Sequence, residues 1–155
     1  MMLLLRILHV VLGALWVGPV VFMALFMEPT MRTIGPDAGK VMAELLRRGF
    51  SRWVFAAGLI TVLAGLALFM VNSSANPDWV HTRAATAYSA GAALAIVGLV
   101  IGGSVVRPGV ARMVSPGFAQ SPEAPALRER LKVAGRIVAA LLVLATLCMA
   151  VARYV

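Results

Sequence analysis

Four apolar runs dominate the pattern of hydrophobic and polar positions along the chain. They cover residues 3–27, 53–71, 84–106 and 133–152. Each run approaches or exceeds the roughly 20 helical residues that cross a bilayer, and lipid leaves a spanning backbone no hydrogen-bond partner outside its own helix. The pattern therefore predicts an all-α membrane protein, a single domain built as a four-transmembrane-helix bundle.

Two connections between these runs show amphipathic patterns. Apolar side chains recur at helical spacing within residues 37–52, with charged side chains on the opposite face, and residues 123–132 repeat the pattern more weakly. Gly35-Pro36 is a natural end for the first helix and start for the second. We expect the first segment to rest on anionic lipid, and docking of a partner is the alternative.

Composition agrees with a membrane protein. Hydrophobic residues make up 61% of the 155 residues and charged residues 13%, against about 45–50% and about 25% in soluble domains. The net charge of +8 does not indicate nucleic-acid binding, because the basic residues flank the apolar runs. The lone Cys148 excludes an internal disulfide. The first run is too long for the apolar core of a signal peptide, so we expect it to be retained.

The distribution of Arg and Lys predicts the topology. Ten basic residues fall in the two long connections, and few lie elsewhere; the ten are Arg32, Lys40, Arg47, Arg48, Arg52, Arg107, Arg112, Arg128, Arg130 and Lys132. Because basic loops stay on the cytoplasmic side, both termini and residues 72–83 face outward. We expect a multi-pass protein of the bacterial inner membrane with both termini in the periplasm.

The two halves of the chain resemble each other. Glu28-Pro29 after the first run matches Arg107-Pro108 after the third, and each pair precedes a further proline and an Arg-rich stretch at an offset of about 80 residues. The repeat predicts two helical hairpins in the same orientation. Glu28 and Arg107 become equivalent positions of opposite sign, and we predict that they form a structural ion pair. Separate extension of each side chain to the headgroups is the alternative.

Small residues at four-residue spacing predict close helix packing in the second and third runs. They are Ala57, Thr61 and Gly65 in the second run, and Gly91, Ala95, Gly98 and Gly102 in the third. Pro19 lacks a backbone donor and is expected to bend the first helix. The bend either has no functional meaning or opens a cofactor cleft.

Candidate chemistry is sparse. The sequence contains no nucleophile motif or phosphate loop, so no catalytic residue is predicted and an enzyme is the less favoured class. No Asp, Glu or Lys lies deep within an apolar run, which argues against an ion-coupled transporter.

The two histidines, His9 and His81, both map to the outer side. Neutral imidazole is the commonest metal ligand and also binds haem. We predict a cofactor site formed by His9, Gly13, His81 and Tyr88, in which Gly13 leaves room for a flat macrocycle and Tyr88 is the repeat counterpart of His9. Haem b is the first candidate, and copper held by His9 and His81 is the second. A hydrogen bond from His9 to a neighbouring backbone is the simpler alternative.

Soft sulfur ligands also occur near the outer ends of the runs, which would suit Cu(I). They are Met1, Met2, Met70, Cys148 and Met149. Five further methionines lie toward the inner side, so the sulfur distribution does not select a site.

The N-terminal half resembles a family of bacterial four-helix membrane proteins. The segments L-H-V at residues 8–10 and A-L-W-V-G at 14–18, followed by Glu28-Pro29, are similar to the membrane domain of copper-resistance protein D and related families. The resemblance implies a four-helix bundle that binds haem b or copper through His9. The more distant protoporphyrinogen oxidase group also uses a basic residue within the third span, where this chain has only Arg83 at the edge.

The functional hypothesis from sequence is therefore a small inner-membrane protein that binds a redox cofactor or metal near its outer face. The alternative is a cofactor-free accessory subunit that packs against other membrane subunits. A transporter of small solutes or lipids is the weakest hypothesis, because the runs lack a polar lining.

Overall fold

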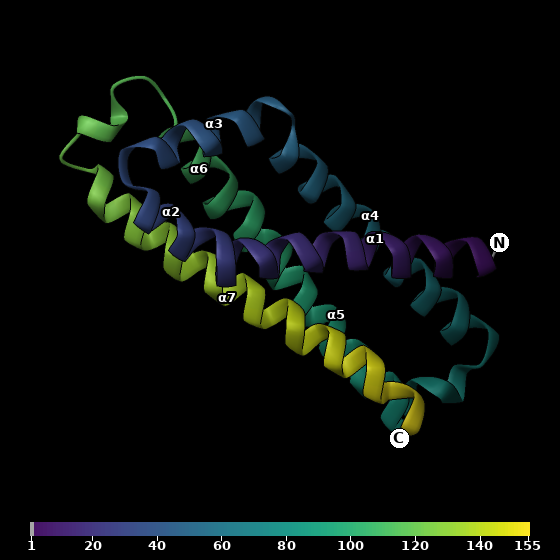
Figure 1. The fold of residues 1–155 in the computed structure, drawn as a ribbon. Coiled ribbons are helices and arrows are strands. Elements are labelled where there is room, and N and C mark those ends of the chain that lie inside the picture. Colours follow the sequence, from purple (N-terminus) through teal and green to yellow (C-terminus); the bar gives the residue numbers. More distant parts are fainter. Residues whose placement is uncertain (1) are drawn as a thin grey trace.

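The computed structural model describes residues 2–155, and all of its regular structure in that range is helical. Four helical stretches are long and apolar enough to cross a membrane: Met2–Ile34, Phe50–Ala75, Arg83–Met113 and Ala124–Tyr154. They pack as an all-α four-helix bundle (Figure 1). The predicted fold class is confirmed.

The chain forms two helical hairpins. Hairpin 1 contains α1 (Met2–Phe22), the π-helix η1 (Met23–Met27), α2 (Glu28–Ile34), η2 (Gly35–Asp37), α3 (Ala38–Arg47) and α4 (Phe50–Ala75). The linking turn is η3 (Pro77–His81). Hairpin 2 contains α5 (Arg83–Ile101), the π-helix η4 (Gly102–Val106), α6 (Arg107–Met113), η5 (Phe118–Gln120), α7 (Ala124–Val151) and η6 (Ala152–Tyr154).

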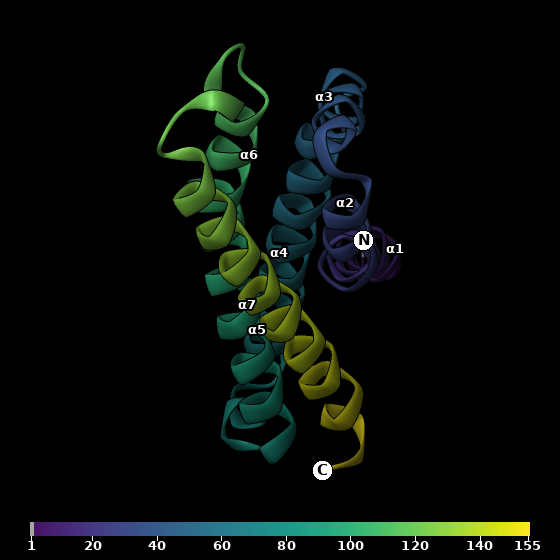
Figure 2. The same cartoon turned by 60° about the vertical axis from the view of Figure 1, so that its left-hand side comes forward.

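Contacts are much denser within each hairpin than between them. In hairpin 1, α1 packs along α4, and in hairpin 2, α5 packs along α7; Figure 2 shows the two hairpins side by side. The chain termini lie at one end of the bundle together with η3, and we call it the terminal end (Figure 1). The other end carries α2, α3 and α6 with most of the basic residues, and we call it the basic end.

The internal repeat is visible in the backbone. Each hairpin has a five-residue π-helix directly before an Xaa-Pro pair, Glu28-Pro29 in hairpin 1 and Arg107-Pro108 in hairpin 2. A proline inside a helix lacks an amide donor and crowds the carbonyl four residues earlier. A π turn widens the helix at that point, which relieves the crowding without ending the helix. The same local chemistry therefore produces the same deformation twice.

Two predicted boundaries need correction. Residues 37–52 do not form one helix, because α3 ends at Arg47 and α4 begins at Phe50. Gly49 separates them with φ of 81°, a left-handed conformation that favours glycine. Residues 123–132 are not a separate segment either, since α7 runs through them without a break. Gly35, with φ of 72°, ends α2 as expected.

The buried core is small and lies between the hairpins. Its largest cluster contains Trp16 from α1, Ala57 from α4, and Val138 and Leu142 from α7. Long apolar side chains such as Leu3, Leu63 and Leu147 point outward and are more than half exposed. An apolar outer surface of this extent is what a lipid environment covers.

Candidate functional site

The interface of hairpin 1 is built from one face of α1 and the small residues of α4. A Cβ added to Gly65 would lie 2.7 Å from Cε1 of His9, and one added to Gly58 would lie 2.6 Å from Cε2 of Trp16. Both glycines are therefore required for the close approach of these rings. Gly65, which receives His9, belongs to the predicted small-residue stripe of the second run, whereas Gly58, which receives Trp16, was not predicted.

His9 uses one ring nitrogen to hold this interface. Its Nδ1 lies 2.8 Å from the backbone oxygen of Thr61. A carbonyl oxygen only accepts, so Nδ1 carries a proton, and in a neutral ring the lone pair would then be on Nε2. The simpler alternative for His9, a hydrogen bond to a neighbouring backbone, is confirmed. The same bond also fixes ring orientation in metal-ligating histidines.

The other three residues of the predicted cofactor site lie in different surroundings. Gly13 faces α4, where an added Cβ would lie at ordinary contact distance, 3.4 Å from Cγ2 of Thr61. His81 is exposed on η3. Tyr88 packs near Trp79, with 6.1 Å between ring centroids. Within residues 2–155, no three His, Cys, Asp or Glu side chains gather as a metal site.

A large cleft opens between the two hairpins in the half of the bundle nearest the basic end. Its volume is about 1100 Å³, and its walls come from all seven α-helices and both π-helices. The deep part is apolar and reaches Trp16 and Val138 of the core, and Pro19 of α1 also lines it. We call this space the basic cleft. None of the residues predicted for the cofactor site lines it.

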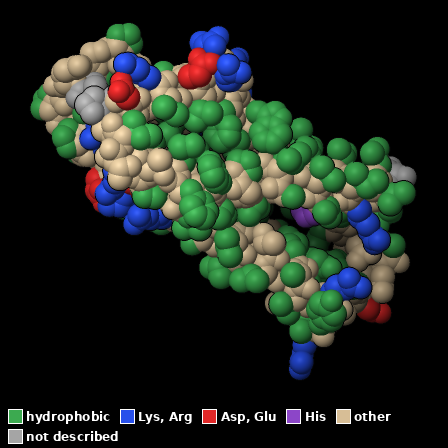
Figure 3. Space-filling model, in the orientation of Figure 1, with side chains coloured by type: hydrophobic (Ala, Val, Ile, Leu, Met, Phe, Trp, Pro, Cys, Tyr) green, Lys and Arg blue, Asp and Glu red, His purple; other side chains and the backbone are tan. Residues whose placement is uncertain are grey.

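The mouth of the basic cleft carries the charged residues. Five are basic and two are acidic: Arg32, Arg107, Arg128, Lys132 and Arg136, with Glu28 and Glu129. Figure 3 shows charged side chains gathered at the end with α2, α3 and α6, separated by an uncharged band from those near the termini. The cleft thus combines apolar walls with a net positive mouth.

Ion pairs in the mouth differ from the predicted one. Glu28 pairs with Arg32 at 2.6 Å and with Arg136 of hairpin 2 at 3.5 Å. The predicted pair with Arg107 is wrong, because the Arg107 guanidinium instead stacks over the ring of Phe55, 5.3 Å from its centroid. Phe55 is itself packed against Gly103, where an added Cβ would lie 2.7 Å from the ring.

Both acidic residues of the mouth are already neutralised. Glu129 binds Lys132 and lies 3.7 Å from Arg32 of hairpin 1, and Glu28 has the two partners given above. Arg107 and Arg128, by contrast, have no carboxylate within 4.0 Å among residues 2–155. The positive charge available to a ligand therefore resides mainly on these two arginines.

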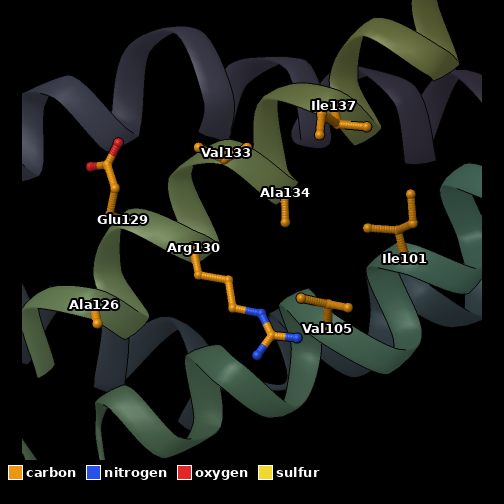
Figure 4. Close-up of a pocket in the computed structure, with 8 residues that line it drawn as sticks. All are labelled: Ile101, Val105, Ala126, Glu129, Arg130, Val133, Ala134 and Ile137. Carbon is orange, nitrogen blue, oxygen red and sulfur yellow. The ribbon is translucent and has the colours of Figure 1, made fainter. Parts of the chain in front are cut away.

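A second, shallower groove lies on another face of α7 and offers a contrast. It has a volume of about 420 Å³ and is more open than the basic cleft. Eight residues of α5, η4 and α7 line it: Ile101, Val105, Ala126, Glu129, Arg130, Val133, Ala134 and Ile137. Figure 4 shows the Arg130 guanidinium reaching across it toward Val105. Its two charged residues are of opposite sign, so it has no net positive mouth.

Sequence reasoning did not identify the basic cleft. A signal was present, since four of the five methionines assigned to the inner side line it, namely Met23, Met31, Met42 and Met113. Methionine is flexible and adapts to irregular apolar ligands. These residues are scattered along four different elements, so only the fold brings them together.

Comparisons of the chain with protein-family models, curated proteins and solved structures return no match. The resemblance to the membrane domain of copper-resistance protein D stays a prediction.

Proposed function

We propose that the chain is a multi-pass protein of the bacterial inner membrane, with the basic end in the cytoplasm and both termini in the periplasm. The support is the separation of charges along the bundle. The basic connections lie together at one end, and basic loops are retained on the cytoplasmic side during insertion. The basic cleft then opens at the level of the inner leaflet.

The function that we propose is binding of an amphiphile in the basic cleft, with its acyl part between the hairpins and its polar part at the mouth. One observation supports it most strongly: a space of about 1100 Å³ has apolar walls and charges confined to its mouth. Ligand sites commonly have volumes of roughly 300–1000 Å³ and apolar walls with a few polar groups that fix orientation. The lining of the basic cleft has these properties.

Fluorescence of Trp16 provides a direct test, because Trp16 lines the deep part of the cleft. The chain has three tryptophans, so Trp53→Phe with Trp79→Phe leaves Trp16 as the sole emitter. In detergent micelles, an amphiphile with a brominated acyl chain should quench this protein with a saturable dependence on concentration. The matched control is Trp53→Phe with Trp16→Phe, which retains Trp79 near the terminal end.

Saturable quenching of Trp16 alone supports a binding site. Quenching that is linear and equal for Trp16 and Trp79 would mean simple partitioning into the micelle, and the proposed function would fail. Purified protein that releases a stoichiometric lipid on organic extraction provides independent support.

A cofactor bound through His9 is the second candidate, with haem b first and copper second. The observation that favours it is the tautomer of His9: its Nδ1 donates to Thr61, which leaves Nε2 free to bind a metal. Such a group would supply electron transfer, and His9 would hold and orient it. The test is the absorption spectrum of the oxidised and reduced protein with metal analysis on the same sample. A Soret band lost on His9→Ala supports haem, whereas a colourless, metal-free protein contradicts both cofactors.

The accessory-subunit alternative predicts a different result in both experiments. A protein without cofactor or saturable amphiphile binding, which purifies from gently solubilised membranes with a constant partner, would favour it. The exposed apolar faces of the helices fit either lipid or a partner subunit.

A further inference from the structure

We infer that the ligand of the basic cleft is an anionic glycerophospholipid, and that Arg107 and Arg128 bind its phosphate. The inference rests on the proposed function, that the cleft takes an acyl chain, and it adds the chemical class of the headgroup.

The charges of the mouth select an anion. Five cations and two carboxylates line the cleft, and both carboxylates already have cationic partners. Arg107 and Arg128 are exposed and have no carboxylate within 4.0 Å among residues 2–155, so both are accessible to an anion. A bound phosphate would neutralise Arg107 and Arg128 without displacing an existing ion pair.

Arg107 is positioned as a phosphate ligand by its neighbours. Its guanidinium lies 5.3 Å from the centroid of Phe55, an arrangement that orients the planar group. Phe55 in turn packs closely against Gly103 of the preceding π-helix, where an added Cβ would lie 2.7 Å from its ring. The edges of the guanidinium stay available to donate hydrogen bonds, and a planar fork of this kind matches two phosphate oxygens.

Arg128 reaches the same cleft from a different element. It belongs to the first part of α7, while Arg107 begins α6, so a ligand held by both bridges the two helices of hairpin 2. Two arginines on independent elements define a position for one anionic group more narrowly than a single flexible cation does.

The acyl chain contributes little to the choice among lipids, so the selectivity of the cleft must come from contacts with the headgroup. Transfer of an acyl chain from a bilayer to an apolar cleft exchanges one apolar environment for another, so the hydrophobic effect contributes little. Discrimination among lipids must then come from contacts that the bilayer surface does not offer. A free phosphate would use the arginines but leave the apolar walls unoccupied, and this favours a phospholipid over a soluble phosphate compound.

The experiment compares lipids that share acyl chains and differ in the headgroup. The Trp16-only protein is titrated in detergent with brominated phosphatidylglycerol and with brominated diacylglycerol of the same chain length. We expect the anionic lipid to bind at least about tenfold more tightly. In Arg107→Gln with Arg128→Gln, the affinity for phosphatidylglycerol should fall to that for diacylglycerol, while diacylglycerol binding stays unchanged.

The matched control is Arg130→Gln, which removes the same charge from α7 but from the second groove. It should retain the preference of the unmodified protein. An equal loss in Arg130→Gln would show that net charge alone attracts the lipid, and the site would be rejected.

The remaining outcomes separate the inference from the proposed function. Equal binding of both lipids by the unmodified protein overturns the headgroup assignment but leaves an amphiphile site in place. Saturable binding of neither lipid overturns the proposed function itself. Inorganic phosphate at the same concentration should not compete; if it displaces phosphatidylglycerol fully, the site recognises soluble phosphate and the lipid assignment is wrong. Unchanged binding of diacylglycerol in the double variant serves as the check that it is folded.

Discussion

Hairpin 1 and hairpin 2 share a backbone plan but pack in opposite ways. In hairpin 1 the large side chains belong to the first helix, where Trp16 of α1 presses on Gly58 of α4. In hairpin 2 they belong to the second helix, where Leu142 of α7 packs on Gly98 of α5. The two central helices, α4 and α5, therefore both carry the small residues, and the two terminal helices supply the bulk.

The difference shows what a repeat conserves. Xaa-Pro pairs impose the same π-helix at matching positions in both hairpins, because that deformation depends on local backbone chemistry. Packing depends on complementarity between two helices, and either helix can supply the large member of a contact. The contacts of hairpin 1 are also more rigid, since they involve aromatic and imidazole rings, whereas an aliphatic side chain can change rotamer.

The largest expected effect follows from this contrast in rigidity. In Gly58→Ala the added methyl would lie 2.6 Å from Cε2 and 2.8 Å from Cδ2 of Trp16, a buried ring. Overpacking of this kind costs about 1–3 kcal/mol, and we expect a value near the top of that range. The apparent melting temperature of the protein in detergent should fall by several degrees.

Gly98→Ala is the matched substitution in hairpin 2. Its added methyl would lie 3.3 Å from Cδ2 of Leu142, a contact that a small shift of the leucine relieves. The melting temperature should change much less than in Gly58→Ala. Equal losses in the two variants would contradict the proposed difference in rigidity.

A smaller effect is expected at the histidine contact of hairpin 1. His9→Ala removes the hydrogen bond to the Thr61 backbone and should destabilise the protein by about 1 kcal/mol. Gly65→Ala places a methyl 2.7 Å from Cε1 of His9 and should displace the ring. Because both changes act on one contact, the double variant should lose less stability than the sum of the single losses. Additive losses, measured by thermal unfolding, would show that the two positions act separately.

The ion pairs between the hairpins are expected to contribute less still. Arg136→Gln removes the 3.5 Å pair with Glu28 across the mouth of the basic cleft, but Glu28 keeps its 2.6 Å pair with Arg32. Ion pairs that stay partly exposed contribute roughly 0–1 kcal/mol. We expect a loss in this range that shrinks further in high salt, measured as the shift in melting temperature at two ionic strengths. An increase of the loss with salt would contradict an electrostatic origin.

The elements of the fold were predictable because the signals are local. Apolar run length predicted the four long helices, and small-residue spacing predicted the Gly65 position of α4 that receives His9, but not Gly58, which receives Trp16. The break at Gly49 was missed because amphipathic periodicity continues across it. The partner of Glu28 in hairpin 2 was missed because the repeat predicted a pair with Arg107. Arg136, which lies on the next helix, α7, pairs with Glu28 instead. Which side chains meet across the two hairpins depends on tertiary geometry. The basic cleft could not be predicted from the sequence for the same reason.

The smallest predicted effect is a pH-dependent change in stability. It is expected in α3, the connection of hairpin 1, and not at the start of α7 in hairpin 2. Hydrogen bonds from Arg47, and then from Arg48, hold the pKa of Glu44 in α3 below its usual range. A carboxylate with a lowered pKa stabilises the folded state above its unfolded pKa of about 4.3, and this contribution disappears as the pH falls through the lower folded value.

The backbone amides of α3 should therefore lose hydrogen-exchange protection, relative to their intrinsic rates, only below about pH 4.3. Because Glu44 is exposed, the change should be about twofold. In Glu44→Gln this acid-dependent step should vanish. An identical step in Glu44→Gln would contradict the assignment. The start of α7 should not show the acid-dependent loss of protection expected for α3. Residues 123–132 continue directly into a long helix. The packing of this helix against α5 and α6 protects its amides more strongly than one exposed ion pair does.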